Sequence, residues 1–219
     1  MGFSFDIAHL LAGLMVLTSL LLLYQDRIGA LLNVLRLHGL VLALALAWQA
    51  HLQSASDLFL AATIALVVKA LVIPGALERL VERLAIHRLI ETVGGIGPTM
   101  LGGIALVALS LRVMLPITAA ADAVSRQDIA LALSVVLIGL LIMVTRRNAV
   151  GQVAGFLSLD NGIDLAAGGA RGMPLVVELS VAVSVLIAFI VIGIFLFRIR
   201  ERFDTVDLAA LEEFRGERR

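Results

Sequence analysis

The sequence has no cysteine, only four histidines, and 16% charged residues. The absence of cysteine excludes disulfides, thiolate-ligated iron–sulfur clusters and a cysteine nucleophile. The histidines are scattered and lack the spacing of metal ligands, so we expect no cofactor and no metal in this chain. A haem held by two histidines from different helices is the one alternative. The four are His9, His38, His51 and His87.

The chain is short of charge and rich in apolar residues. A soluble domain carries about 25% charged and about 45–50% apolar residues, whereas 61% of these 219 residues are hydrophobic. An apolar surplus of this size needs lipid as its solvent. The formal net charge is zero, and there is no basic face of the kind that nucleic acid requires. We predict an all-α, polytopic membrane helix bundle that does not bind nucleic acid.

Seven apolar segments approach the roughly 20 residues that a transmembrane helix needs. We predict a bundle over residues 1–198 and a cytoplasmic tail over 199–219. Residues 78–91 have the pattern of a short interfacial amphipathic helix, or equally of an extension of the third span. The seven predicted spans are 7–24, 28–50, 58–77, 92–111, 129–145, 149–170 and 173–197.

Lysine and arginine gather in alternate loops and in the tail, which sets the expected orientation. Cytoplasmic loops carry the excess of basic residues in membrane proteins. With the amino terminus outside, the inner side receives most of the arginines, and Arg126 and Arg171 fall outside, with Arg112 at a helix end. We therefore predict that the amino terminus is outside and the carboxyl terminus is cytoplasmic.

Ionisable residues within the predicted spans are the candidate functional residues, because each costs about 2.5–3.5 kcal/mol at the bilayer centre. Lys69 and Asp160 both fall near the predicted midplane, so they can pair if their helices touch. Asp164 lies one turn from Asp160 on the same helix face. Glu178 falls at a depth similar to that of Asp164, on the helix that returns.

These four residues are candidates for a proton or ion relay. Burial and a neighbouring ammonium act on a carboxylate in opposite directions, and such a mixture can hold protonatable groups near neutral pH. The alternatives are polar contacts between helices, or a water-facing position for Asp164 and Glu178. Arg36 and His38 are weaker candidates, because a long arginine can reach the interface and a histidine can be a hydrogen-bonded packing residue.

Four segments carry a resemblance to a known family. Residues 145–166 read TRRNAVGQVAGFLSLDNGIDLA, residues 66–74 read LVVKALVIP, residues 173–181 read MPLVVELSV and residues 203–211 read FDTVDLAAL. In these segments, and in their order and spacing, the chain resembles hydrogenase-4 component E, a membrane subunit of formate-hydrogenlyase and related energy-converting nickel–iron hydrogenases. Its carboxyl-terminal part is similar to the K-type subunit of complex I and the C-type subunit of sodium/proton antiporters.

The resemblance implies a membrane-arm subunit of an oxidoreductase complex, without an active site or cofactor of its own, in the inner (cytoplasmic) membrane. Its implied partners are antiporter-like membrane subunits and a peripheral hydrogenase module. Its implied role is to help couple redox chemistry to ion movement. By position, Lys69, Asp160 and Glu178 match polar residues of the family.

The chain departs from the family at two positions. The family usually has glutamate at the position of Asp160, and can have aspartate at the position of Ser184. Two alternatives therefore stand beside a relay subunit. One is a purely structural or assembly subunit of such a complex, and the other is a small standalone transporter.

Overall fold

The computed structural model describes residues 2–83, 92–117 and 123–169, and these residues are helical apart from short connections. They belong to one compact unit. No strand occurs in these ranges, and an isolated antiparallel bridge joins Thr92 to Arg146. The predicted all-α class is confirmed. The helices are α1 (Gly2–Tyr24), α2 (Ile28–Gln53), α3 (Ser56–Ile64), η1 (Ala65–Val72), α4 (Ile73–Arg83), α5 (Ile96–Ile117), α6 (Ala123–Thr145) and α7 (Ala149–Gly169).

Five helices in this part of the chain are long and apolar enough to cross a membrane. One of them, Ser56–Glu82, runs without interruption through α3, η1 and α4. These five correspond to the first five predicted spans and establish a polytopic membrane protein. The five are Asp6–Tyr24, Ile28–Gln53, Ser56–Glu82, Ile96–Met114 and Gln127–Thr145.

The last two predicted spans have different outcomes. The sixth forms α7, a helix of 21 residues, but α7 is not among the five helices above. Its polar residues, including Asp160 and Asp164, make it less apolar than its neighbours. The seventh predicted span, 173–197, and the predicted tail, 199–219, lie outside the described residues.

Two predicted boundaries of the fourth helix were wrong. The helix begins at Ile96, not at residue 92, because Gly94 and Gly95 adopt φ values of 79° and 84°, a left-handed conformation that interrupts a helix. It continues to Ile117, so Arg112 lies within the helix and not at its end.

The polar segment after the third span begins as part of that span. Residues 78–83 continue α4 without a break, which agrees with the extension and not with a separate interfacial helix. Residues 84–91, the rest of that predicted segment, lie outside the described residues.

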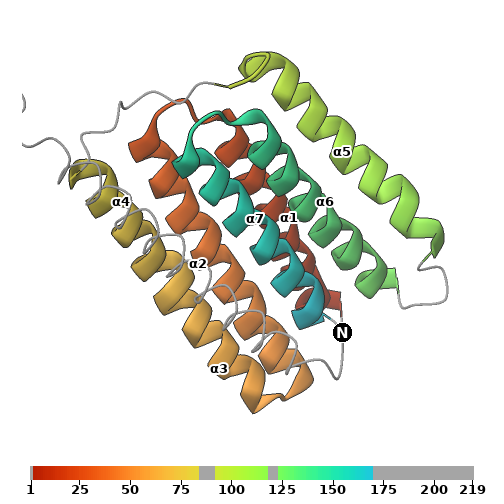
Figure 1. Cartoon of the computed structure of the whole chain (residues 1–219). Coiled ribbons are helices and arrows are strands. Elements are labelled where there is room, and N and C mark those ends of the chain that lie inside the picture. The colour runs from red at the N-terminus through yellow and green to blue at the C-terminus, as the bar shows by residue number, and fades with distance from the viewer. Residues whose placement is uncertain (1, 84–91, 118–122, 170–219) are drawn as a thin grey trace, which may run out of the picture. The chain divides into compact units, whose positions relative to one another are not determined.

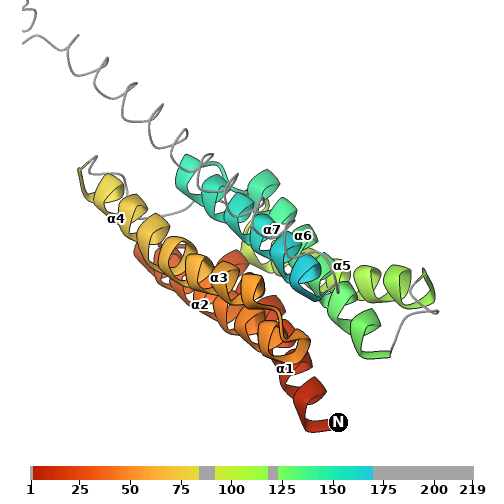
Figure 2. The same ribbon diagram turned by 90° about the horizontal axis from the view of Figure 1, so that it is seen from below.

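The helices pack so that α7 is covered by its neighbours. It contacts α6, α2 and α1 (Figure 1), and α2 lies beside α3 (Figure 2). Glycines allow α6 and α7 to approach closely: a Cβ atom on Gly139 would lie 2.8 Å from the carbonyl oxygen of Gly155. This close packing of small residues is typical of helix pairs in membranes. These contacts fix α7 against α6.

A buried cluster of one lysine and two aspartates

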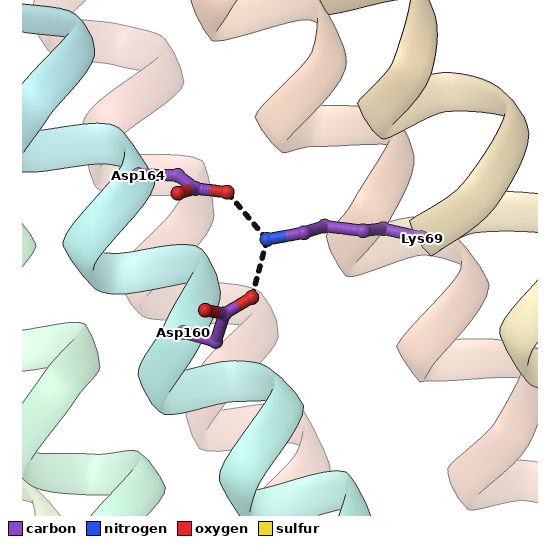
Figure 3. Close-up of polar contacts among 3 residues, drawn as sticks. All are labelled: Lys69, Asp160 and Asp164. Carbon is purple, nitrogen blue, oxygen red and sulfur yellow. Dashed lines mark hydrogen bonds and ion pairs between the residues drawn. The ribbon is translucent and has the colours of Figure 1, made fainter. Parts of the chain in front are cut away.

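Lys69, Asp160 and Asp164 meet inside the protein. The ammonium of Lys69 donates hydrogen bonds to Oδ2 of both aspartates (Figure 3). The side chains are 2%, 10% and 0% exposed, respectively. The Lys69–Asp160 pair that the sequence allowed is therefore formed, and Asp164 joins it. One ammonium forms ion pairs with two carboxylates in a site that is almost completely shielded from bulk solvent.

Helix geometry places the two carboxylates. Residues four apart lie on the same face of an α-helix, about one turn from each other. Asp160 and Asp164 have this spacing within α7, and both point toward the helix that carries Lys69 (Figure 3). One long side chain can therefore bridge both.

The backbone around Lys69 is unusual. Lys69 lies within η1, a π-helical segment of eight residues, and π-helical turns are rare and frequent at functional sites. Pro74 follows five residues later and has no N–H, so it cannot donate the α-helical bond to residue 70. The N–H of Ile73, whose α-helical acceptor would be the carbonyl of Lys69, donates to the carbonyl of Val68, five residues back. Lys69 therefore lies in a turn that is wider than that of a regular α-helix.

Gly39 brings α2 against this π-helical segment. A Cβ atom on Gly39 would lie 2.8 Å from the nitrogen of Ala70 and 2.8 Å from the carbonyl carbon of Lys69. Real Cβ atoms essentially never come so close, so a side chain here would force the two backbones apart. The glycine therefore contributes to the position of Lys69.

Further polar side chains of α1, α2 and α7 form hydrogen bonds in the interior. His38 of α2 is fully buried, and its Nδ1 is hydrogen-bonded to the Thr18 hydroxyl of α1 over 2.7 Å. The hydroxyls of Ser19 and Ser158 are 3.2 Å apart and join α1 to α7. His38 also lies within electrostatic reach of Lys69. Polar side chains thus connect α1, α2, η1 and α7 in the interior.

The structure separates Arg36 from this cluster. Its guanidinium pairs with Glu78 of α4 and donates to Asn33 over 2.6 Å. The side chains of Arg36 and Glu78 are 31% and 45% exposed. Arg36 therefore ties α2 to α4 near the surface. Glu178, the remaining predicted relay residue, lies outside the described residues, as does Ser184.

Arg146 is a buried charge whose structural role the sequence did not reveal. It is 1% exposed and donates to the carbonyls of Leu22 and Leu23, at 3.2 and 2.6 Å, and to the Thr92 hydroxyl at 2.7 Å. A cation at the carboxyl end of α1 also complements the helix dipole. Burial lowers the pKa of Arg146, an effect that the charge of Asp26 opposes. Through these hydrogen bonds, Arg146 connects the α6–α7 loop to the end of α1 and to the turn before α5.

Sequence reasoning missed the neutral members of the network, namely Thr18, Ser19 and Ser158. Hydroxyl residues in apolar helices commonly bond to their own backbone, so they do not stand out individually. A signal for the unusual backbone was present in the proline five residues after Lys69. Within the described ranges, no group of three histidine, aspartate or glutamate side chains has the arrangement of a metal site.

The fold and the cluster together define a polytopic helical membrane protein with an ion-paired charge cluster in its interior. The chain belongs to the family of the Mycobacterium tuberculosis protein Rv0085, an uncharacterized protein, with 35% identity over 207 residues that cover 93% of this chain and 94% of that protein.

The chain is also similar to hydrogenase-4 component E of Escherichia coli K12. The identity is 28% over 213 residues, covering 96% of this chain and 98% of that protein, and the Shigella flexneri protein of the same description matches equally. This similarity extends the resemblance seen in the motifs to nearly the whole chain. No family model and no solved structure matches this chain.

Proposed function

We propose that this chain is a membrane-arm subunit of a hydrogenase complex in the inner membrane, and that its buried charges take part in proton or ion translocation. The similarity to hydrogenase-4 component E along nearly the full chain supports the assignment to such a complex. The chain has no catalytic role in this proposal. Its partners are antiporter-like membrane subunits and a peripheral hydrogenase module.

The observation that carries the translocation role is the ammonium of Lys69 held by two buried aspartates. A charge inside a membrane protein is costly and is commonly found on an ion pathway. Because one cation is shared, a proton taken up by Asp160 leaves Lys69 paired with Asp164, and the reverse also holds. The cluster can therefore change its charge by one unit without leaving the ammonium unpaired. In the proposal, Glu178 continues the path toward neighbouring subunits.

A purely structural role is the second candidate, and the same contacts favour it. The ion pairs and the Ser19–Ser158 hydrogen bond join three helical segments, η1, α7 and α1, as an assembly subunit would require. Polar side chains between membrane helices stabilise packing by about 0.6 kcal/mol each on average. The two candidates make different predictions for an assembled complex.

The deciding experiment measures hydrogenase turnover and ion uptake together, in vesicles that contain the complete complex. Asp160→Asn, Asp164→Asn and Glu178→Gln are compared with Asp57→Asn, a matched control whose carboxylate is exposed at the start of α3. The relay predicts fewer ions moved per turnover for the first three and no change for the control. Normal coupling in assembled variants would assign the chain a structural role. Ion uptake by the purified chain alone would instead indicate a standalone transporter.

A further inference from the structure

The contacts of α7 show which of its sides the neighbouring helices occupy. A Cβ atom on Gly155 or Gly162 would lie too close to the backbone of α6, so these two residues mark the α6 side. Ser158 marks the α1 side through its hydrogen bond to that helix. A Cβ atom on Gly168 would meet a leucine side chain of α2. In the described part of the chain, α6, α1 and α2 are the helices that pack on α7.

One sector of α7 lies outside these contacts. An α-helix turns by about 100° per residue, which places this sector between the side of Asp160 and the side of α6. The residues of this sector, called here the open face of α7, are Gln152, Phe156, Leu159 and Ile163. Their spacing of four, three and four residues puts them on one face. Gln152 and Ile163 are exposed, Ile163 by 43%.

The open face borders the lysine–aspartate cluster. Ile163 lies three residues from Asp160, on the neighbouring side of the same helix. Both α7 and η1 pack on α2, so Lys69 reaches the two aspartates across the surface of α2. That helix covers one side of the cluster, and the open face adjoins the other. Charges in contact with hydrocarbon are costly, so we expect a further protein segment on this side.

The chain itself supplies a segment for this position. Because α7 ends at Gly169, the predicted seventh span begins only four residues later, at Met173. Four residues of extended chain reach about 14 Å at most, and packed helices are about 8–10 Å apart. The segment must therefore start beside α7. Residues 173–182 are apolar except for Glu178 and Ser180, as a segment between protein and lipid requires.

We propose that residues 173–182 pack as a helix on the open face of α7 and cover the lysine–aspartate cluster on the side opposite α2. The other sides of α7 are occupied, and the short connection keeps the segment beside this helix. Ten helical residues extend about 15 Å, which reaches the depth of Asp160, nine residues before Gly169. The inference does not depend on the transport role. It adds to the proposed function a way in which the charges are kept from lipid.

Paired cysteines in the full-length chain test this proposal, because the chain has no cysteine of its own. Ile163→Cys lies six residues before Gly169, and position 179 lies six residues after Met173, so the two fall at similar depth. After oxidation in native membranes, mass spectrometry identifies the linked peptides. Ile163→Cys is combined in turn with Val177→Cys, Leu179→Cys, Ser180→Cys and Val181→Cys. We expect a disulfide at the positions on one side of the added helix, since a disulfide requires Cα atoms within about 7 Å.

Val113→Cys is the matched control. Val113 is 42% exposed, almost the same as Ile163, but it belongs to α5, which packs on α6 and α1. Combined with the same four positions, it should give no disulfide. The proposal is overturned if Ile163→Cys forms none of the four links, or if the control forms them equally well. It is also overturned if, in the complete complex, Ile163→Cys is linked to a neighbouring subunit and not to this segment.

Fluorescence quenching by brominated lipids tests the same contact without a disulfide. The background variant Trp48→Phe removes the one tryptophan of the chain. In this background, Val113→Trp should be quenched strongly by the brominated lipid, whereas Ile163→Trp should lose most of that quenching because protein covers it. Equal quenching of the two variants would show that lipid covers the open face, and the proposal would be wrong.

These readouts report a contact and not transport, so they separate this inference from the proposed function. Disulfides from Ile163→Cys together with normal ion coupling in the aspartate variants would retain the covering segment and reject the transport role. No disulfide together with impaired coupling would retain the transport role and reject the covering segment.

Discussion

The backbones of Gly39 and Ala70 are so close that a Cβ atom on Gly39 would lie 2.8 Å from the nitrogen of Ala70. Ala70 follows Lys69 in η1, so this approach couples the position of α2 to that of the buried ammonium. Tight backbone contacts through glycine are a recurring feature of membrane helix pairs.

Gly39→Ala should therefore destabilise the protein. Overpacking of this kind costs about 1–3 kcal/mol, more than the roughly 1 kcal/mol that alanine gains over glycine within a helix. The measurement is thermal unfolding in nanodiscs. Gly13→Ala is the matched control, because a Cβ atom there meets nothing within 4 Å, and it should be neutral or stabilising. Equal unfolding midpoints for the two variants would contradict the close approach.

Asp160→Asn should be tolerated better than Lys69→Met. The first variant leaves one ammonium beside one carboxylate, whereas the second leaves two carboxylates four residues apart without Lys69. Removing one partner of a buried ion pair costs about 3–5 kcal/mol. Chemical unfolding of both variants in the same detergent checks the order. If Lys69→Met proved the more stable, the ammonium would not be the group that stabilises the cluster.

The hydrogen bond between Ser19 and Ser158 should couple α1 to α7 weakly. Hydrogen bonds between membrane helices contribute about 0.6 kcal/mol on average. A double-mutant cycle of Ser19→Ala and Ser158→Ala should give a coupling energy of that order. Thr63→Ala in place of Ser19→Ala supplies the control, since the Thr63 hydroxyl bonds only within its own helix in the described structure and should show no coupling.

Arg146→Lys should lower stability although it keeps the charge. A lysine has a single nitrogen and cannot reproduce the fork with which the guanidinium contacts Thr92 and two carbonyls of α1. Hydrogen bonds to charged groups contribute about 1.5–3 kcal/mol each. Arg27→Lys is the control, because Arg27 is exposed. Thermal unfolding should separate the two, and the same midpoint for both would show that the contacts of Arg146 do not stabilise the fold.

The predicted orientation can be read out with introduced cysteines, because the chain has none of its own. Ser54→Cys lies between α2 and α3 and Asp26→Cys lies between α1 and α2, on opposite predicted sides. In intact cells, a membrane-impermeant maleimide should label the first directly and the second only after permeabilisation. The reverse pattern would invert the assigned topology.

The sequence predicted the helices well because long apolar runs leave few other structures in lipid. It placed Lys69 and Asp160 at similar depth but could not show that their helices meet, since helix contacts depend on side-chain packing and not on periodicity. The approach of Gly39 escaped prediction for the same reason, whereas the π-helical turn had a local signal in Pro74, five residues after Lys69. The start of α5 was misjudged because the left-handed Gly94 and Gly95 look like ordinary small residues in an apolar segment.

The limited apolarity of α7 has a consequence for how the protein is made. Asp160 and Asp164 make this helix a poor candidate to leave the translocon for lipid on its own. Close packing against α6 and the ion pairs with the ammonium of Lys69 stabilise α7 in the membrane where its own apolarity does not suffice. Both lie earlier in the chain, so they are synthesised before α7 emerges. Membrane insertion of α7 therefore depends on segments that are already in place.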